Sequence, residues 1–591
     1  MKGRFLITTA LEETWREDVP VLFLGEWCRR YSRRERWSKM NAEVLPYHWD
    51  DRAKLYADYQ HLQDFYERLL LDLSTQLNQI HRVDHGLRYW RILIGPWLGY
   101  FIQMLFDRWT NIQKASEQHE LSSTAILIGQ EDSHVPNDMD EFRGLHVRDE
   151  WNHHIYSIIL REHTKIHCIE QTQRNPEPIR TAPPDIPWTH KMKRGLAPWI
   201  SQYRRFVGRE RDAFFYATYL PFFDEMRMHC RMSQLPQPTH SVLPAQIAMN
   251  HIQRRWTLPA GDRHGFEACA RDLIPRQIPK VYLEGYAQLI VQTTGLPWPK
   301  RPSVICTSNP IVDDVFKSWA AAKVEQGTPL VIGQQGGGYG IGKWSFLEDH
   351  QIAICNRYLS WGWSIPGNPK VLPVGQLKSR RPIRHRSTIR STALLVTGMH
   401  PRHSYWMYST PVAHQWLGYL ADQFSFAEHL PSNIRDVLTV RMYRHDYGWD
   451  QLQRWKDRFP SVILDDGFSD INALLRNCRL AISTYNSTTF LEWFSMDIPT
   501  IIYWNPSHWE LRASAAPHFA DLKRVGIFHE TPESAARQVA TLWDDVDTWW
   551  RNPERREVLD RFKARYCDLP NDLLGRVEHA IRDASSPSTS R

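Results

Sequence analysis

A glycine-rich segment near the middle of the chain has the spacing of a phosphate-binding loop. Residues 333–344 read GQQGGGYGIGKW, and from Gly337 to Lys343 they match the pattern G-x-x-x-x-G-K. A nucleotide-hydrolysing loop continues with Ser or Thr, which binds Mg²⁺, whereas here the next residue is Trp344. The segment therefore predicts a loop that offers backbone N–H groups to an anion, with a tight structural turn as the alternative. The residues expected to contact that anionic ligand are Gln335, Gly336, Gly337, Gly338, Tyr339 and Lys343.

Polar residues also follow four apolar, strand-like segments in the last third of the chain, at 392–398, 437–443, 461–466 and 480–485. In a parallel sheet the carboxyl ends of the strands meet at one edge, where ligands bind. We therefore expect these residues to face one crevice. They are His400, Arg402, Arg444, Asp465, Asp466, Ser487, Thr488, Thr489 and Glu492.

The stretch from Ser487 to Glu492 predicts a helix that begins at the crevice. Its free N–H groups and the positive end of its dipole would favour a phosphate. Glu492, one turn into the helix, could accept hydrogen bonds from ribose hydroxyls. The same spacing also fits a capping box. Asp465-Asp466-Gly467 likewise fits a simple turn after a strand.

The C-terminal half resembles the nucleotide-binding domain of GT-B glycosyltransferases. The pairing of His400-Pro401 with the later Ser/Thr-rich helix start is similar to the HP and S-S/T motifs of bacterial transferases that use CMP-activated sugars, such as sialyl- and Kdo-transferases. In those families the His and Ser/Thr residues hold the CMP phosphate. The resemblance also implies a catalytic base at Asp465 or Asp466, although this acidic motif follows the HP motif here instead of preceding it.

A second resemblance covers nearly the whole chain. Four segments, TTALEETW (8–15), FLGEWC (23–28), QQGGGYG (334–340) and YLSWGW (358–363), resemble a transferase family of bacterial O-antigen and surface-polysaccharide gene clusters. This resemblance implies a transferase without naming its donor.

Carboxylates in the N-terminal half are candidates for the acid–base or nucleophilic step of the transfer. Glu26 follows the apolar run FLG, and Asp149 and Glu150 lie in RDEWNHH. Glu26, and either Asp149 or Glu150, could accept the proton of an acceptor hydroxyl or form a glycosyl-enzyme intermediate. Asp149 and Glu150 could instead cap the helix that begins near Trp151.

Alternating strands and helices predict an α/β fold of the GT-B type, in which two Rossmann-like domains face each other across a cleft. We expect an N-terminal domain with helical insertions at 1–375 and a linker at 376–391, where the sequence is basic and lacks apolar periodicity. A C-terminal nucleotide-sugar-binding domain would follow at 392–583, and a disordered tail at 584–591.

Composition limits the class of protein. The net charge is +7 over 591 residues, which is too mild for a dedicated nucleic-acid-binding protein. Eight scattered cysteines without a C-x-x-C pair argue against a zinc site or a disulfide framework. The D-x-D triplet at Asp138–Asp140 is a weak metal candidate, and we predict neither a catalytic metal nor a cofactor.

The apolar segment 89–106 contains Arg91 and Pro96 and predicts a buried core segment. We expect a cytoplasmic protein, with peripheral association at the inner membrane left open.

These observations predict a metal-independent glycosyltransferase that moves a sugar from a nucleotide-activated donor, with a CMP-sugar favoured. The acceptor would be a surface polysaccharide or O-antigen, as a glycan or lipid-linked glycan. The alternatives are a phosphotransferase that uses a CDP-polyol and a non-catalytic glycan-binding scaffold of the same fold. An ATPase would require the missing Ser or Thr after Lys343.

Overall fold

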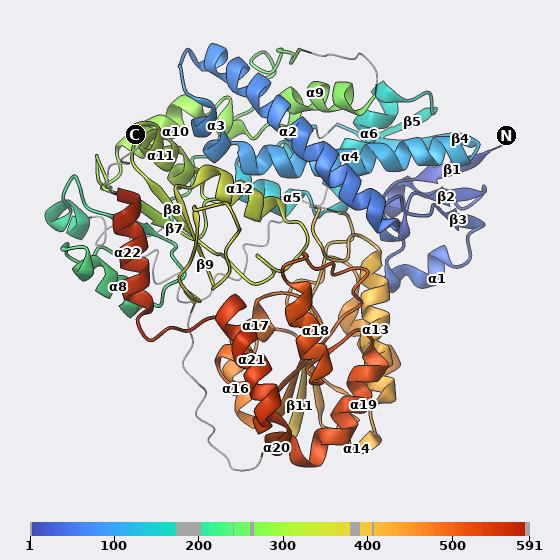
Figure 1. Cartoon of the computed structure of the whole chain (residues 1–591). Coiled ribbons are helices and arrows are strands. Elements are labelled where there is room, and N and C mark those ends of the chain that lie inside the picture. Colours follow the sequence, from blue (N-terminus) through green and yellow to red (C-terminus); the bar gives the residue numbers. More distant parts are fainter. Residues whose placement is uncertain are drawn as a thin grey trace.

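The computed structural model describes residues 3–129, 131–172, 202–239, 241–259, 265–378, 390–404 and 407–585. Within these ranges the chain forms three parallel β-sheets with helices packed against them (Figure 1). The third sheet and its helices lie below the first two in this view. The expected α/β class is confirmed.

The first sheet has the strand order β3-β2-β1-β4-β5, and all its pairings are parallel. Its strands are β1 (Arg4–Ile7), β2 (Val21–Phe23), β3 (Ala42–Val44), β4 (Leu121–Ile128) and β5 (Cys168–Thr172). The helices of this part are α1 (Arg34–Trp37), α2 (Arg52–His81), α3 (Leu87–Leu93), α4 (Gly95–Gln118), α5 (Met139–Leu145) and α6 (Asp149–His163).

The second sheet has the order β10-β9-β8-β7-β6 and is also parallel throughout. Its strands are β6 (Phe214–Tyr216), β7 (Ile305–Thr307), β8 (Leu330–Gly333), β9 (Arg357–Ser360) and β10 (Val371–Pro373). The helices of this part are α8 (Phe222–Arg231), α9 (Phe266–Gln277), α10 (Tyr286–Thr294), α11 (Asp314–Glu325) and α12 (Phe346–Ile354). The region expected to form one Rossmann-like domain thus contains two separate sheets.

The third sheet has the order β13-β12-β11-β14-β15-β16. In chain order this is 3-2-1-4-5-6, the arrangement of dinucleotide-binding Rossmann folds. Its strands are β11 (Thr392–Val396), β12 (Leu438–Arg441), β13 (Ile463–Asp465), β14 (Cys478–Ser483), β15 (Thr500–Tyr503) and β16 (Phe528–His529). Its helices are α13 (Gln415–His429), α14 (Ser432–Arg435), α15 (Gln451–Arg458), α16 (Ile471–Asn477), α17 (Thr488–Ser495), α18 (Ala516–Arg524), α19 (Pro532–Leu542), α20 (Val546–Arg551) and α21 (Pro553–Tyr566).

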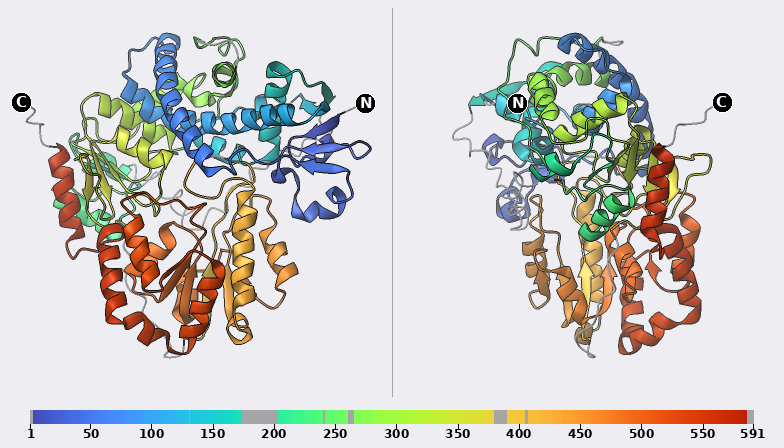
Figure 2. Two further views of the ribbon diagram at one scale, coloured as in Figure 1. Left: turned by 45° about the vertical axis from the view of Figure 1, so that its right-hand side comes forward. Right: turned by 90° about the vertical axis from the view of Figure 1, so that its left-hand side faces the viewer.

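The last helix, α22 (Leu573–Ser585), returns to the second sheet. Val577 and Ile581 share a buried apolar cluster with Phe215, Cys306 and Leu359. Both views of Figure 2 show this red helix against the second sheet, apart from the other red helices. The C-terminal helix of the expected domain 392–583 therefore packs on the N-terminal half. Of the expected tail, residues 584 and 585 end this helix and 586–591 lie outside the described residues. Residues 379–389 of the expected linker also lie outside them.

The apolar segment 89–106 lies in the buried parts of α3 and α4, as the sequence predicts. Tyr89, Trp97 and Leu105 are all buried there. Within the described ranges, no helix combines the length and apolar composition needed to cross a membrane.

Candidate functional site

A cavity of about 460 Å³ lies between the second sheet and the carboxyl edge of the third. Its size is within the range of small-molecule sites. It brings together the glycine-rich segment after β8, the segment after β11 and the start of α17. The lining residues that the sequence singled out are Gln335, Gly336, Gly337, Gly338, Tyr339, His400, Ser487, Thr488 and Thr489. A unit built on the second sheet and the Rossmann-type unit of the third sheet thus meet at one cavity.

Gln334 fixes the start of the glycine-rich loop. This side chain is fully buried, and its Oε1 accepts hydrogen bonds from the Trp361 backbone N–H at 2.9 Å and from Trp363 Nε1 at 2.8 Å. Its Nε2 donates to the Gly336 carbonyl at 2.8 Å. The segment YLSWGW therefore acts on the site indirectly, because its two tryptophans hold the glutamine from which the loop departs.

The loop touches the first turn of α17 directly. The Gly337 N–H donates to Thr488 Oγ1 at 2.8 Å. A Cβ atom at Gly337 would lie 2.4 Å from the Ser487 carbonyl carbon and the Thr488 nitrogen, so only glycine fits this approach. On its far side the loop is held by Glu348, which accepts from the Gly340 N–H at 2.7 Å and pairs with Arg512 at 2.8 Å. The loop is thus anchored to both halves of the protein.

The N-terminus of α17 opens into the cavity. Ser487 is its N-cap residue and makes no capping hydrogen bond through its side chain. Thr489 Oγ1 lies 2.6 Å from the Tyr485 hydroxyl. The first N–H groups of a helix have no partner within it and lie at the positive end of its dipole. This end of α17 can therefore receive an anion, as the sequence predicts.

Asn486 is a site residue that the sequence reasoning missed. It lines the cavity and is only 6% exposed. Its Oδ1 has no hydrogen-bond partner among the described residues. A buried polar atom without a partner is costly, so this amide is suited to bind a ligand hydroxyl or N–H group. Its position in the sequence, between the end of a strand and a Ser/Thr-rich helix start, could have indicated that Asn486 lines the cavity.

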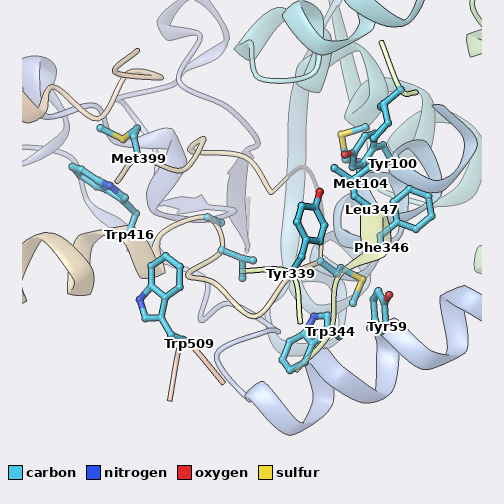
Figure 3. Packing of buried hydrophobic residues seen from close by; sticks show 14 of the residues in the cluster. Tyr59, Tyr100, Met104, Tyr339, Trp344, Phe346, Leu347, Met399, Trp416 and Trp509 are labelled. Carbon is cyan, nitrogen blue, oxygen red and sulfur yellow. The ribbon is translucent and has the colours of Figure 1, made fainter. Parts of the chain in front are cut away.

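Aromatic side chains form much of the cavity wall. Figure 3 shows Tyr339 between a group that contains Met399 and Trp509 and a group that contains Trp344. Rings of this kind pack against sugar C–H faces and nucleobases. Of these rings, only Tyr339 was predicted from the sequence to contact the ligand. The aromatic lining residues are Tyr219, Tyr339, Trp344, Tyr408, Tyr443, Tyr447, Tyr485 and Trp509.

His400 lines the cavity from the segment after β11. Trp449 Nε1 donates to the His400 carbonyl at 2.9 Å, and the imidazole lies 5.8 Å from the Trp509 ring. Burial and, secondarily, the positive charge of Arg52 lower the pKa of His400 to about 4. The imidazole is therefore neutral at pH 7.

Asp149 and Arg402 do not line the cavity, because they bind each other. Asp149 Oδ2 accepts from Arg402 Nη2, and Asp149 Oδ1 accepts from His403 Nε2 at 3.1 Å and from the Ala10 N–H at 3.2 Å. Burial opposes ionisation of Asp149, but the Arg402 charge and the His403 hydrogen bond outweigh it and hold the pKa of Asp149 far below its usual range. The pair joins the third-sheet unit to α6, so the structure gives both residues a structural contact in place of the expected site contact.

The other predicted carboxylates are also engaged outside the cavity. Asp465 Oδ1 accepts from Arg441 Nη1 at 2.8 Å and from the Gly467 N–H at 3.0 Å. Asp466 is exposed, and its Oδ1 accepts from the Phe468 N–H at 3.1 Å. The simple turn is therefore the better interpretation of this motif. Glu26, at the start of a short 3₁₀ turn, accepts from Arg29 Nε at 2.9 Å.

Three predicted donor-binding residues also lie away from the cavity lining. Lys343 is exposed, and its Nζ lies 4.2 Å from the centre of the Tyr56 ring on α2. Arg444 is exposed after β12. Glu492 is buried and pairs with Lys378 at 3.1 Å.

The described part of the cavity lining is therefore uncharged at pH 7. None of the described residues that line it is Asp, Glu, Lys or Arg. An anion there would be held by backbone N–H groups and hydroxyls. No three His, Cys, Asp or Glu side chains in the described part of the chain are grouped as metal ligands. In the D-x-D triplet, Asp138 caps α5 through a 2.9 Å hydrogen bond from the Glu141 N–H.

Comparison with protein families gives one match that spans nearly the whole chain. Residues 4–577 match the family described as LIC12162 family transferase. The chain belongs to this family. The expectation of a transferase family, drawn from the segments at 8–15, 23–28, 334–340 and 358–363, is thus confirmed. The likeness to CMP-sugar transferases stays a prediction.

Comparison with solved structures gives only weak overlays. MurG from Acinetobacter baumannii is 13% identical in sequence, and the match covers 48% of this chain and 75% of MurG with a TM-score of 0.28. A variant of the wall teichoic acid polymerase TagF is 9% identical in sequence, and the match covers 50% of this chain and 85% of TagF with a TM-score of 0.27. WaaG, a glycosyltransferase involved in lipopolysaccharide biosynthesis, is 13% identical in sequence. The match covers 64% of this chain and 100% of WaaG with a TM-score of 0.27. Overlays this weak carry no argument about activity. No match was found among curated proteins.

Proposed function

We propose that this transferase moves a sugar from a nucleotide-activated donor to a hydroxyl group of a glycan. The observation that carries the proposal is the convergence of the glycine-rich loop, His400 and the N-terminus of α17 on one cavity. The glycine-rich loop and the N-terminus of α17 supply N–H groups for a phosphate. The aromatic wall supplies flat faces for the sugar and the base. We assign donor binding to the predicted lining residues of the glycine-rich loop and of the start of α17, together with Asn486.

The uncharged lining favours a donor with a single phosphate. A helix N-terminus offers the equivalent of roughly half a positive charge, and no lysine or arginine is found among the described lining residues. A CMP-sugar brings one negative charge to the phosphate position, whereas UDP-, GDP- or CDP-linked donors bring two. At the phosphate position, this low charge suits the CMP-sugar donor that the HP motif suggests. We further propose that transfer needs no metal and that the acceptor is a surface-polysaccharide or O-antigen glycan.

A thermal-shift screen tests the proposed donor. The purified protein is measured with CMP, CDP, UDP, GDP, dTDP and ATP, with and without Mg²⁺. Binding at about 100 times Kd adds about 2.7 kcal/mol of stability, so a true ligand raises Tm. We expect a selective rise with CMP that does not depend on Mg²⁺. A selective rise with UDP, GDP or dTDP would refute the CMP-sugar donor, and one with CDP would favour the polyol phosphotransferase.

Two variants locate the site within this screen. Thr488→Val removes the hydroxyl that receives the Gly337 N–H and should weaken the CMP shift. Lys343→Ala is the matched control, because Lys343 lies outside the cavity, and it should keep the full shift. A Mg²⁺-ATP shift that is lost in Lys343→Ala would show that the segment at 333–344 is a nucleotide-hydrolysing loop instead.

A further inference from the structure

The proposed transfer requires a group that takes the proton of the attacking hydroxyl. Three of the carboxylates that the sequence suggests for this role are paired with arginines, Asp149 with Arg402, Asp465 with Arg441 and Glu26 with Arg29. The fourth, Asp466, is exposed and is not among the described residues that line the cavity. No described residue of the cavity lining carries a carboxylate or an amine. The acceptor of this proton must therefore be sought among the remaining lining residues.

We propose that the imidazole of His400 accepts the proton of the acceptor hydroxyl during sugar transfer. This inference rests on the proposed function. Among the described lining residues, His400 is the one whose side chain carries a basic nitrogen, since the others carry hydroxyl, amide, indole or apolar groups.

The surroundings of His400 leave its imidazole available. Its backbone carbonyl is held by Trp449 Nε1, which fixes the chain without using the ring. No hydrogen bond to the ring was found from the described residues. His403, three residues later, makes an instructive contrast, because its ring is buried and bonds Asp149. Of the two histidines in this segment, only His400 faces the cavity.

The ring is also in the protonation state that the role requires. The pKa of His400 is lowered to about 4 by burial and by the charge of Arg52 on α2. Arg52 is itself paired with Glu510, so it does not occupy the cavity. At pH 7 one ring nitrogen of His400 therefore holds a free electron pair.

The step balances with His400 in this role. The acceptor oxygen forms a bond to the anomeric carbon while its proton passes to the imidazole. The bond between the anomeric carbon and the phosphate oxygen breaks, and its electron pair leaves with the CMP phosphate. The N–H groups at the start of α17 stabilise the charge that develops on this oxygen. The imidazolium then gives its proton to water.

The alternative role is donation of an imidazole N–H to the donor phosphate, as the HP resemblance implies. The two roles differ in what binding requires. A phosphate ligand contributes to the affinity for CMP itself. A proton acceptor acts on the incoming hydroxyl and contributes to kcat, with little effect on the affinity for CMP.

The test compares His400→Gln with the wild-type protein in two measurements. The first is the Kd for CMP by calorimetry. The second is kcat for release of CMP from CMP-N-acetylneuraminate and CMP-Kdo, with water as the acceptor. We expect kcat to fall by about 10²–10⁴-fold, the usual contribution of general base catalysis, and Kd to stay within about threefold. His445→Gln, which replaces an exposed histidine after β12, is the matched control and should leave both values unchanged.

A second variant distinguishes loss of the imidazole from loss of the fold. His400→Ala leaves space for added imidazole, which should restore part of kcat, while imidazole should not affect His445→Ala. A parallel rise in Kd and fall in kcat for His400→Gln would overturn the proposal in favour of phosphate binding. So would an unchanged kcat, or the absence of rescue in a folded His400→Ala that binds CMP. If the wild-type protein neither binds CMP nor releases it, the proposed donor itself fails.

Discussion

Some of the predicted site residues line the cavity, and others hold the two halves of the protein together. His400 and Arg402 are two positions apart, yet the first faces the cavity and the second binds Asp149. Because Asp149 is already neutralised by Arg402, it is a poor proton acceptor near neutral pH. For single residues, the contacts of a side chain therefore indicate its role better than its residue type does.

Asp149→Ala should therefore destabilise the fold. It leaves the guanidinium of Arg402, which is 4% exposed, without its carboxylate. Breaking one partner of a buried pair typically costs about 3–5 kcal/mol. Urea denaturation measures this loss. Asp466→Ala is the control, because its carboxylate is exposed and surface changes usually stay within about 0.5 kcal/mol. Unchanged stability in Asp149→Ala with loss of transfer would instead make Asp149 catalytic.

Among the elements, the glycine-rich loop and the first turn of α17 form one unit. The loop belongs to the second sheet and α17 to the third, and Gly337 brings their backbones into contact. Neither backbone can move aside as a flexible side chain would. The proposed ligand-binding face of α17 thus depends on Gly337, which lies 151 residues before Thr488 in the chain.

Gly337→Ala should uncouple this unit without unfolding the protein. The new Cβ would meet backbone atoms at 2.4 Å, so the loop must withdraw from α17. We expect the Kd for CMP to rise about tenfold or more, equivalent to a loss of about 1.4 kcal/mol in binding free energy. Calorimetry measures this change. Gly418→Ala, on α13 with open space around it, should bind CMP normally. Equal affinity in the two variants would show that the loop does not shape the site.

The sequence predicts the elements better than the contacts between them. Parallel strands, the start of α17 and the loop after β8 each have a local pattern, so they could be predicted and placed at one edge. The partner of a charged residue has no such pattern. The local sequence around Asp465 does not indicate that it pairs with Arg441, and the local sequence around Asp149 does not indicate that it pairs with Arg402. The second sheet was missed for a related reason, since strand pairing is set by contacts between distant segments.

Considered as a whole, the molecule buries several histidines in neutral form. Burial is the main cause that lowers the pKa of His146 and His350 to about 3 and that of His403 to about 4. In an unfolded chain the value is about 6.5. Between these values the unfolded state binds more protons than the folded state, so the free energy of unfolding falls as pH falls.

We therefore expect stability to decrease steadily as pH is lowered from about 6.5 to 4. Chemical denaturation at a series of pH values measures the slope. His350→Leu should flatten it, because this change removes one buried ring that the unfolded state protonates. Stability that stays constant between pH 6.5 and 4.5 would contradict neutral burial of these side chains.

The central claim is that one cavity between the two halves holds a nucleotide donor with its phosphate at the start of α17. A crystal structure with CMP tests this most directly. We predict a phosphate within hydrogen-bonding distance of the N–H groups of Ser487 to Thr489, the Asn486 amide on a ligand hydroxyl or N–H group, and the ribose and base against the tyrosine wall. CMP bound outside this cavity, or an empty cavity at saturating CMP, would contradict the account.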